Sequence, residues 1–109
     1  MAHGELEKLT RGERLAIDRR RRGERQRAAA QRLQVPLSRY SRWERDLDQA
    51  SPSVRVGSLK AHERCYLYRR RAGKTQGEVA ADMNVCRYWL NRMELGEADC
   101  TDLACYWEA

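Results

Sequence analysis

Residues Thr75 to Gly96 read TQGEVAADMNVCRYWLNRMELG, and this stretch decides the fold that the sequence predicts. Thr75 is a favourable N-cap residue, and Glu78 three positions later completes a capping box, so a helix is predicted to begin at Gln76. Its apolar face is predicted to consist of Val79, Ala80 and Met83.

A second helix, over 86–95, is predicted to follow a sharp turn. Asn84 tolerates the left-handed conformation that such a turn requires, and Val85 can return to the core between the two helices. Leu90 and Met93 lie three residues apart and are predicted to face inward. The residues left on the other faces are Arg87, Tyr88, Trp89, Asn91 and Arg92.

Ten residues in and just before this stretch follow the pattern of a known family. They are Arg69, Gly73, Thr75, Gln76, Ala80, Val85, Leu90, Met93, Glu94 and Gly96. In order and spacing they resemble the lambda-repressor and Cro-like helix-turn-helix family, with Asn84 in place of the family's usual turn glycine. The resemblance implies a small helical bundle whose second motif helix enters the major groove of DNA.

The sequence also repeats itself, because residues 9–44 align without a gap with residues 59–94 at a constant offset of fifty. Twelve positions are identical, and many of them also carry the family resemblance. We therefore predict an all-α fold of two tandem, small helix-turn-helix bundles of lambda-repressor-like type packed in one chain. The predicted units are residues 1–52 and 53–109.

The first copy is predicted to contain the same elements as the second. They are a helix from Thr10 to Arg22 ended by Gly23, a helix over 26–33, a turn over 34–36 and a helix over 37–46. Tyr40 and Trp43 occupy the inward positions of Leu90 and Met93, so both aromatic residues are predicted to pack in the core. The residues predicted to point outward are Ser38, Arg39, Ser41 and Arg42.

Two more helices are predicted outside the repeated motif. Pro52 and Ser53 are expected to open a helix that continues through Gly57. A last short helix, capped by Thr101 or Asp102, is expected to close the second core. Its packing residues are predicted to be Leu103, Cys105, Tyr106 and Trp107.

The resemblance also implies residue roles. Gln26 and Gln76 would dock on phosphate beside a helix N-terminus. The implied reading faces are Leu37, Ser38, Arg39, Ser41 and Arg42 in the first copy, and Arg87, Tyr88, Trp89, Asn91 and Arg92 in the second. The family pairs an arginine of its first helix with the glutamate that ends the reading helix. Here this implies two structural ion pairs, Arg19 with Glu44 and Arg69 with Glu94.

Tyr88 and Trp89 leave two interpretations of the second copy open, because they replace Ser38 and Arg39 of the first. Aromatic side chains there suit stacking on a sugar or contact with thymine methyl groups. They equally suit a protein interface, where tyrosine and tryptophan are enriched. Only the helix over 37–46 is therefore predicted to read DNA on its own evidence.

Charge points to a polyanionic partner, since 22 lysine and arginine residues face 16 aspartate and glutamate residues, a net charge of +6. The excess is concentrated in residues 1–52, which hold 13 basic and 8 acidic residues. No apolar run is long enough for a membrane span, and the N-terminal Met-Ala-His-Gly-Glu is not a signal peptide, so we expect a cytoplasmic protein.

Catalysis and metal binding are not expected. The chain has no phosphate-binding glycine loop, and its four cysteines form no Cys-x-x-Cys pair and lie at no zinc-finger spacing from a histidine. We expect no cofactor. Cys65 and Cys105 are predicted to be core residues, and Cys86 and Cys100 to lie nearer the surface.

These observations predict a sequence-specific regulator of transcription that binds double-stranded DNA, a repressor of phage or prokaryotic type. The alternative is a protein-interaction module that keeps the helix-turn-helix fold and binds a polymerase, another regulator or its own copy through Tyr88 and Trp89. Sequence-independent binding to nucleoid DNA is a third class, which requires the charge but not two different reading faces.

Overall fold

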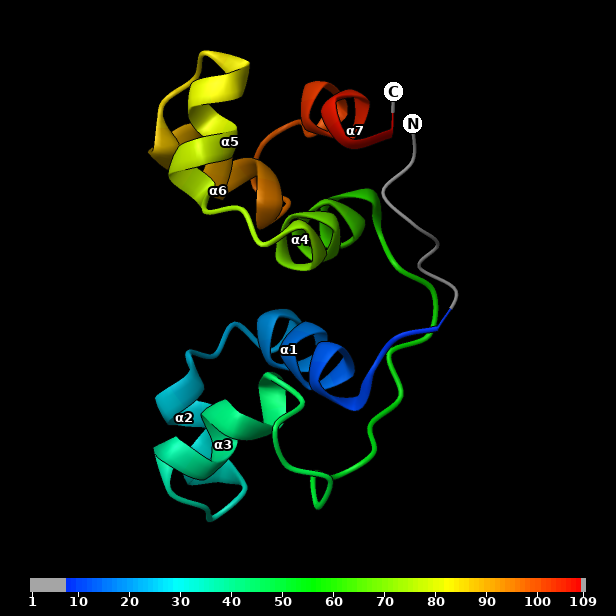
Figure 1. Cartoon of the computed structure of the whole chain (residues 1–109), viewed down its shortest axis with the longest axis vertical. Helices are drawn as coiled ribbons and strands as arrows, with labels where there is room; N and C mark the ends of the chain where they lie inside the picture. Colours follow the sequence, from blue (N-terminus) through cyan, green and yellow to red (C-terminus); the bar gives the residue numbers. More distant parts are fainter. Residues whose placement is uncertain (1–7, 109) are drawn as a thin grey trace. The chain divides into compact units, whose positions relative to one another are not determined.

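The computed structural model describes residues 8–108, and all seven elements within this part of the chain are helices (Figure 1). Their residues divide into two compact units, 8–58 and 59–108, which we call the first unit and the second unit. The division falls after Ser58, whereas the sequence placed it after Pro52. None of the helices is long and apolar enough to cross a membrane. The N-terminal residues examined for a signal peptide lie outside the described residues.

The first unit opens with helix α1 (Arg11–Arg21), whose start is fixed by a capping box. The Thr10 hydroxyl accepts from the Glu13 N–H at 3.1 Å, and the Glu13 carboxylate accepts from the Thr10 N–H at 2.9 Å. Gly23, with φ 71°, lets the chain leave the helix in the left-handed conformation, as predicted.

Two short helices, α2 (Gln26–Arg32) and α3 (Leu37–Glu44), complete the helical part of the first unit. Gln34, with φ 58°, makes the turn between them, as Asn84 with φ 57° does in the second unit. Helix α3 ends at Glu44 and not at Asp46, because Asp46 is itself left-handed with φ 59° and breaks the helix.

The core of the first unit confirms the predicted inward residues of α3. Tyr40 is fully buried and Trp43 is 7% exposed. Their rings meet edge to face with centroids 6.4 Å apart, an arrangement that aromatic pairs favour. Leu15, Ala29 and Ala30 complete this cluster.

The prediction of a helix that starts at Pro52 is wrong, because residues 51–57 are not helical and α4 begins only at Ala61. Burial in this segment alternates along the chain, with Val54 and Val56 turned inward and Arg55 exposed. That period of two is typical of extended backbone and outweighed the helix-opening proline.

Two arginines of α1 hold this extended segment. Arg11 donates to the carbonyl oxygens of Gln49 and Ser51, and Arg21 donates to those of Val56 and Ser58. These carbonyl oxygens accept from arginine side chains, so they do not depend on the backbone N–H groups that would satisfy them in a helix. The arginine run at the end of α1 therefore has a structural use within the first unit.

The second unit contains four helices: α4 (Ala61–Ala72), α5 (Gln76–Met83), α6 (Arg87–Glu94) and α7 (Thr101–Glu108). The predicted capping box of α5 is present, since Thr75 accepts from the Glu78 N–H at 3.1 Å and Glu78 accepts from the Thr75 N–H at 2.8 Å. When fifty is added to the residue numbers, the ranges of α1, α2 and α3 match those of α4, α5 and α6 to within one residue at each end.

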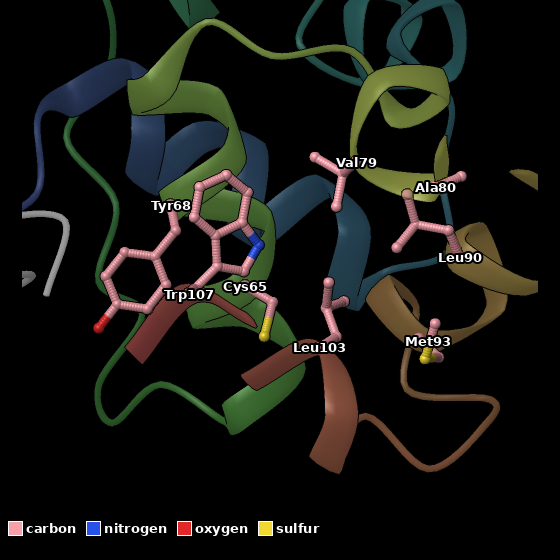
Figure 2. Packing of buried hydrophobic residues seen from close by; sticks show 8 residues of the cluster. All are labelled: Cys65, Tyr68, Val79, Ala80, Leu90, Met93, Leu103 and Trp107. Atoms are coloured by element: carbon pink, nitrogen blue, oxygen red, sulfur yellow. The ribbon is translucent and has the colours of Figure 1, made fainter. Parts of the chain in front are cut away.

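Figure 2 shows the core of the second unit, in which Leu90 and Met93 of α6 point inward with Val79 and Ala80 of α5. Trp107 of α7 stacks on Tyr68 of α4, with ring centroids 6.2 Å apart. Helix α7 thus covers α4, and the predicted closing role of the last helix is confirmed.

One cysteine was misplaced by the sequence. Cys65 is buried, as predicted, but Cys105 is exposed. The buried residues of α7 are Leu103 and Trp107, one helical turn apart, and Cys105 lies between them on the opposite face. The expected cap was also wrong, because Thr101 is inside the helix and donates its N–H to the Asp99 carboxylate at 3.0 Å.

Two pairs of contacting residues have different residue types in the two units. An ion pair of Glu24 with Arg32 in the first unit corresponds to Lys74 with Asp82 in the second, with reversed charges and N···O distances of 2.9 and 3.0 Å. Gly12 and Asp46 in the first unit correspond to His62 and Gly96 in the second, where the small residue has changed sides. Both exchanges preserve a local contact while altering its chemistry.

Candidate nucleic-acid interface

The outer face of α3 carries the residues predicted to read DNA. Ser38, Arg39 and Arg42 are exposed, Ser41 is half-buried, and Leu37 at the start of the helix is 38% exposed. Because Tyr40 and Trp43 fix the inward face, this helix has one orientation, and its polar residues face solvent.

Arg45 belongs to the same face, although the sequence analysis missed it. It lies seven residues after Ser38 and three after Arg42, so the three share one stripe of the helix surface. Its Nε donates to the Ser41 carbonyl at 3.4 Å, which leaves its terminal nitrogens exposed. Helix spacing alone places Arg45 on this face, but the family resemblance implied roles only for residues up to Glu44.

Arg42 and Arg39 differ in whether the guanidinium is already hydrogen-bonded within the unit. Arg42 donates to the Leu47 carbonyl at 3.1 Å, and its equivalent Arg92 donates to the Glu97 carbonyl at 3.3 Å. Their identity in both copies thus has a structural explanation, the bracing of the loop after the helix. Arg39 makes no hydrogen bond or ion pair within the described chain, so its whole guanidinium is available to a ligand.

Both predicted ion pairs are present at the ends of α3 and α6. Arg19 donates to both carboxylate oxygens of Glu44, at 2.6 and 3.3 Å, and Arg69 to both oxygens of Glu94, at 2.7 and 3.0 Å. The carboxylates are 4% and 0% exposed, so each pair is a buried link between the end of α3 or α6 and the first helix of its unit.

The glutamines implied to dock on phosphate also contact these carboxylates. Gln26 donates its amide to Glu44 at 3.0 Å. Gln76 donates to Glu94 and to Asn91, each at 3.1 Å, which occupies both of its N–H groups. A carboxylate only accepts, so these amide orientations are fixed. Gln26 alone keeps a side-chain N–H for a phosphate oxygen.

The N-termini of α2 and α5 differ in their capping and charge. At α5, Thr75 and Glu78 cap the helix and place a carboxylate beside it. At α2, Arg25 and Ala28 stand at the same positions, and no side chain caps the first N–H groups. Arg27, also exposed, replaces Gly77. Arg25 and Arg27 belong to no motif of the sequence, but aligning the two copies shows that they replace Thr75 and Gly77.

The outer face of α6 and its C-cap expose three large apolar residues. Tyr88 is 70% exposed, Trp89 42% and Leu95 40%. Arg92 lies over the Trp89 ring, with its Cζ 5.4 Å from the ring centroid, and its Nε is 3.9 Å from a Glu97 carboxylate oxygen. Its guanidinium is therefore less available to a ligand than that of Arg39. The other two predicted residues are Arg87, which is exposed, and Asn91, which is half-buried and accepts from Gln76.

Charge separates the two units. Residues 8–58 hold 14 basic and 6 acidic residues, whereas residues 59–108 hold 8 of each. A hollow of about 340 Å³ in the first unit lies at the start of the extended segment and is lined by Arg11, Asp46, Asp48, Gln49 and Ser51. A hollow of about 710 Å³ in the second unit adjoins the N-terminus of α5 and is lined by Arg69, Lys74 and Arg87.

The cations beside that second hollow are largely engaged. Arg69 pairs with Glu94, and Lys74 donates to Tyr106 and Asp82, each at 3.0 Å. The hydrogen bond to Tyr106, and after it the one to Asp82, raises the pKa of Lys74. The hydrogen bonds that Asp82 accepts from Tyr106 and Lys74 lower the pKa of Asp82. Only Arg87 there is without an ion pair in the described chain.

No three histidine, cysteine, aspartate or glutamate side chains gather as metal ligands in the described residues. Burial raises the pKa of the Cys65 thiol to about 12, so this thiol stays protonated at neutral pH. Comparisons of the chain with protein-family models, curated proteins and solved structures gave no match.

Proposed function

We propose that the chain is a sequence-specific regulator of transcription that binds double-stranded DNA and reads the major groove with α3. In this proposal both units are helix-turn-helix units of the lambda-repressor and Cro-like type, formed by α2 with α3 and by α5 with α6. Action as a repressor follows from the resemblance alone.

The observation that carries the proposal is the joined basic surface of the first unit. Gln26 at the first position of α2 bonds to Glu44 at the last position of α3, so the two helix ends adjoin. The uncapped N–H groups of α2 therefore lie beside the end of α3. Backbone N–H groups at a helix start favour phosphate, and flanking arginines strengthen that preference. The arginines concerned are Arg25, Arg27, Arg39, Arg42 and Arg45.

The residues on α3 suit contact with base edges. Arginine can donate twice to guanine, and a serine hydroxyl can serve as donor or acceptor for several bases. Arg39 is the proposed guanine reader because its guanidinium is unengaged, and Ser38 beside it is short enough to allow close approach. Arg25, Arg27 and Gln26 would position the helix on the phosphates.

The experiment is selection of bound fragments from random double-stranded DNA by the full chain. We expect one enriched motif, and we expect Arg39→Ala to lose the preference at one base position at a cost of about 1–3 kcal/mol. Arg55→Ala is the matched control, because it removes an exposed arginine of the same unit away from α3. Binding without an enriched motif would contradict the proposal and favour sequence-independent binding.

A second candidate function is a protein-interaction module, which the exposure of Tyr88 and Trp89 favours. Exposed aromatic residues concentrate binding energy at protein interfaces. This function predicts no enriched motif in the same selection and no effect of Arg39→Ala on partner binding.

A further inference from the structure

Helix α6 presents a gathered apolar surface to solvent. Three of the five exposed large hydrophobic residues of the described chain lie on this helix or its C-cap: Tyr88, Trp89 and Leu95. Tyr88 and Leu95 are seven residues apart and share a face, with Trp89 next to it. Scattered exposed apolar residues are ordinary, but a contiguous patch marks a surface that another molecule covers.

The equivalent surface of α3 shows that this patch is not required by the fold. The positions of Tyr88, Trp89 and Leu95 are held in the first unit by Ser38, Arg39 and Arg45. The two helices occupy equivalent positions, Leu37–Glu44 and Arg87–Glu94, and both bury their inner residues. The large apolar residues of α6 therefore serve something that α3 does not do.

DNA is a poor occupant for this surface. The guanidinium of Arg92 lies on the Trp89 ring, and its Nε is 3.9 Å from the exposed Glu97 carboxylate. The capping box at α5 takes up N–H groups that a phosphate would use, and Glu78 adds a negative charge there. The second unit as a whole holds equal numbers of basic and acidic residues, so it lacks the field that attracts a polyanion.

We propose that the outer face of α6 binds the same face of a second copy of the chain, so that the protein forms a reversible homodimer. A two-fold axis pairs one surface with itself. In the proposed dimer this axis runs perpendicular to α6, so the two α6 helices are antiparallel. This brings the exposed Arg87 at the start of one helix toward Glu97, which follows the end of the other. The neutral charge of the unit adds no repulsion between copies, and antiparallel helix dipoles attract.

The size of the surface sets the strength of the dimer. A helix of eight residues is about 12 Å long, so α6 and its flanks form an interface at the low end, below about 1,200 Å² in total. We expect a dissociation constant in the micromolar range. A dimer would present two copies of the first unit, and, on the proposed function, would bind two DNA half-sites related by a two-fold axis.

The test is sedimentation equilibrium of the full chain from about 1 µM to 500 µM without DNA. We expect a monomer–dimer equilibrium that Trp89→Ala and Tyr88→Ser each weaken at least tenfold. Arg39→Ala, at the position equivalent to Trp89, is the matched control and should dimerise like the parent. Both aromatic side chains are exposed, so the variants should keep their helical circular dichroism.

Tryptophan fluorescence gives an independent readout. Trp43 and Trp107 are 7% and 1% exposed, so quenching by acrylamide reports mainly on Trp89. Quenching should fall as the concentration rises. A parent chain that stays monomeric at 500 µM, or a Trp89→Ala chain that dimerises like the parent, would overturn the inference. So would a Trp89→Ala chain that loses a DNA half-site but keeps its oligomeric state.

These results separate the dimer from the proposed function. Loss of the dimer with an intact enriched DNA motif would refute only this inference. A dimer without any enriched motif would refute only the proposed reading of DNA by α3.

Discussion

Glycines show how single residues decide which contacts the helices can make. Gly12 and Gly77 occupy the second position of α1 and of α5. A Cβ at Gly12 would lie 2.4 Å from the Glu44 carbonyl oxygen, which is backbone and cannot move aside. A Cβ at Gly77 would meet only the Thr75 hydroxyl, at 3.8 Å. The same residue type is thus obligatory at one position and replaceable at the other.

We expect Gly12→Ala to destabilise the first unit by about 1–3 kcal/mol, because α1 must move away from the end of α3. Gly77→Ala, the matched control, should stabilise by about 0.5 kcal/mol, since alanine favours the helix over glycine. Urea unfolding followed by circular dichroism measures both. Equal midpoints for the two variants would show that the approach of Gly12 to Glu44 is not a tight contact.

The importance of Gly12 could not be read from the sequence, because it depends on a partner 32 residues away. The repeat does contain the information in another form. Where the first unit has Gly12, the second has His62, and the glycine appears instead at Gly96, where a Cβ would lie 2.7 Å from the His62 ring. Residue exchanges between copies therefore identify contacts that one copy alone conceals.

At the scale of elements, the ion pair between Arg69 and Glu94 joins α6 to α4. Glu94 has no exposed surface, and it accepts from Arg69 and Gln76. Removing the buried carboxylate leaves Arg69, which is only 16% exposed, without its partner, and this costs more than the pair itself contributes.

We expect Glu94→Ala to lower the free energy of unfolding by about 3–5 kcal/mol, and Glu44→Ala to do the same in the first unit. Glu97→Ala is the control, because its carboxylate is 59% exposed and an exposed change costs within about 0.5 kcal/mol. Urea midpoints give the comparison. If Glu94→Ala and Glu44→Ala both unfold at the same urea midpoint as the parent, the pairs do not stabilise the ends of α3 and α6.

The elements predicted best from the sequence are those with a local signal at their ends. The capping box at Thr75 and the turn at Asn84 placed α5 within one residue, and the repeat carried this placement to α2. The end of α3 and the segment after it were predicted wrongly. There the structure depends on the left-handed Asp46 and on Arg11 and Arg21 of α1, and no local pattern announces such distant hydrogen bonds.

The candidate site was predicted in part, for the same reason. The outward residues of α3 and the two ion pairs follow from helix periodicity and the family resemblance. The uncapped start of α2 was missed because a missing cap leaves no motif to recognise. Arg25, Arg27 and Arg45 became candidates only when the surfaces of the two units were compared position by position.

At the scale of the whole molecule, the two units share one pattern of helices but differ in the charge and polarity of their surfaces. The first unit has 14 basic and 6 acidic residues, and its unengaged arginines surround α2 and α3. The second unit is neutral and exposes aromatic residues instead. Electrostatic attraction to DNA should therefore reside in the first unit, and its dependence on salt tests this division directly.

We expect the logarithm of the DNA affinity to fall linearly with the logarithm of the salt concentration, at a slope of about −0.9 for each phosphate contacted. Arg25→Ala and Arg27→Ala should each reduce the steepness of that slope by about 1 and weaken all DNA sequences alike, because on the proposed function these arginines contact phosphate. Arg87→Ala in the second unit, which removes the same charge beside the equivalent helix start, should leave the slope unchanged. Titration of labelled DNA between about 50 and 200 mM salt measures all three variants. A slope that responds to Arg87→Ala but not to Arg25→Ala would move the DNA contact to the second unit, since the charge that releases counterions is the charge that lies against the phosphates.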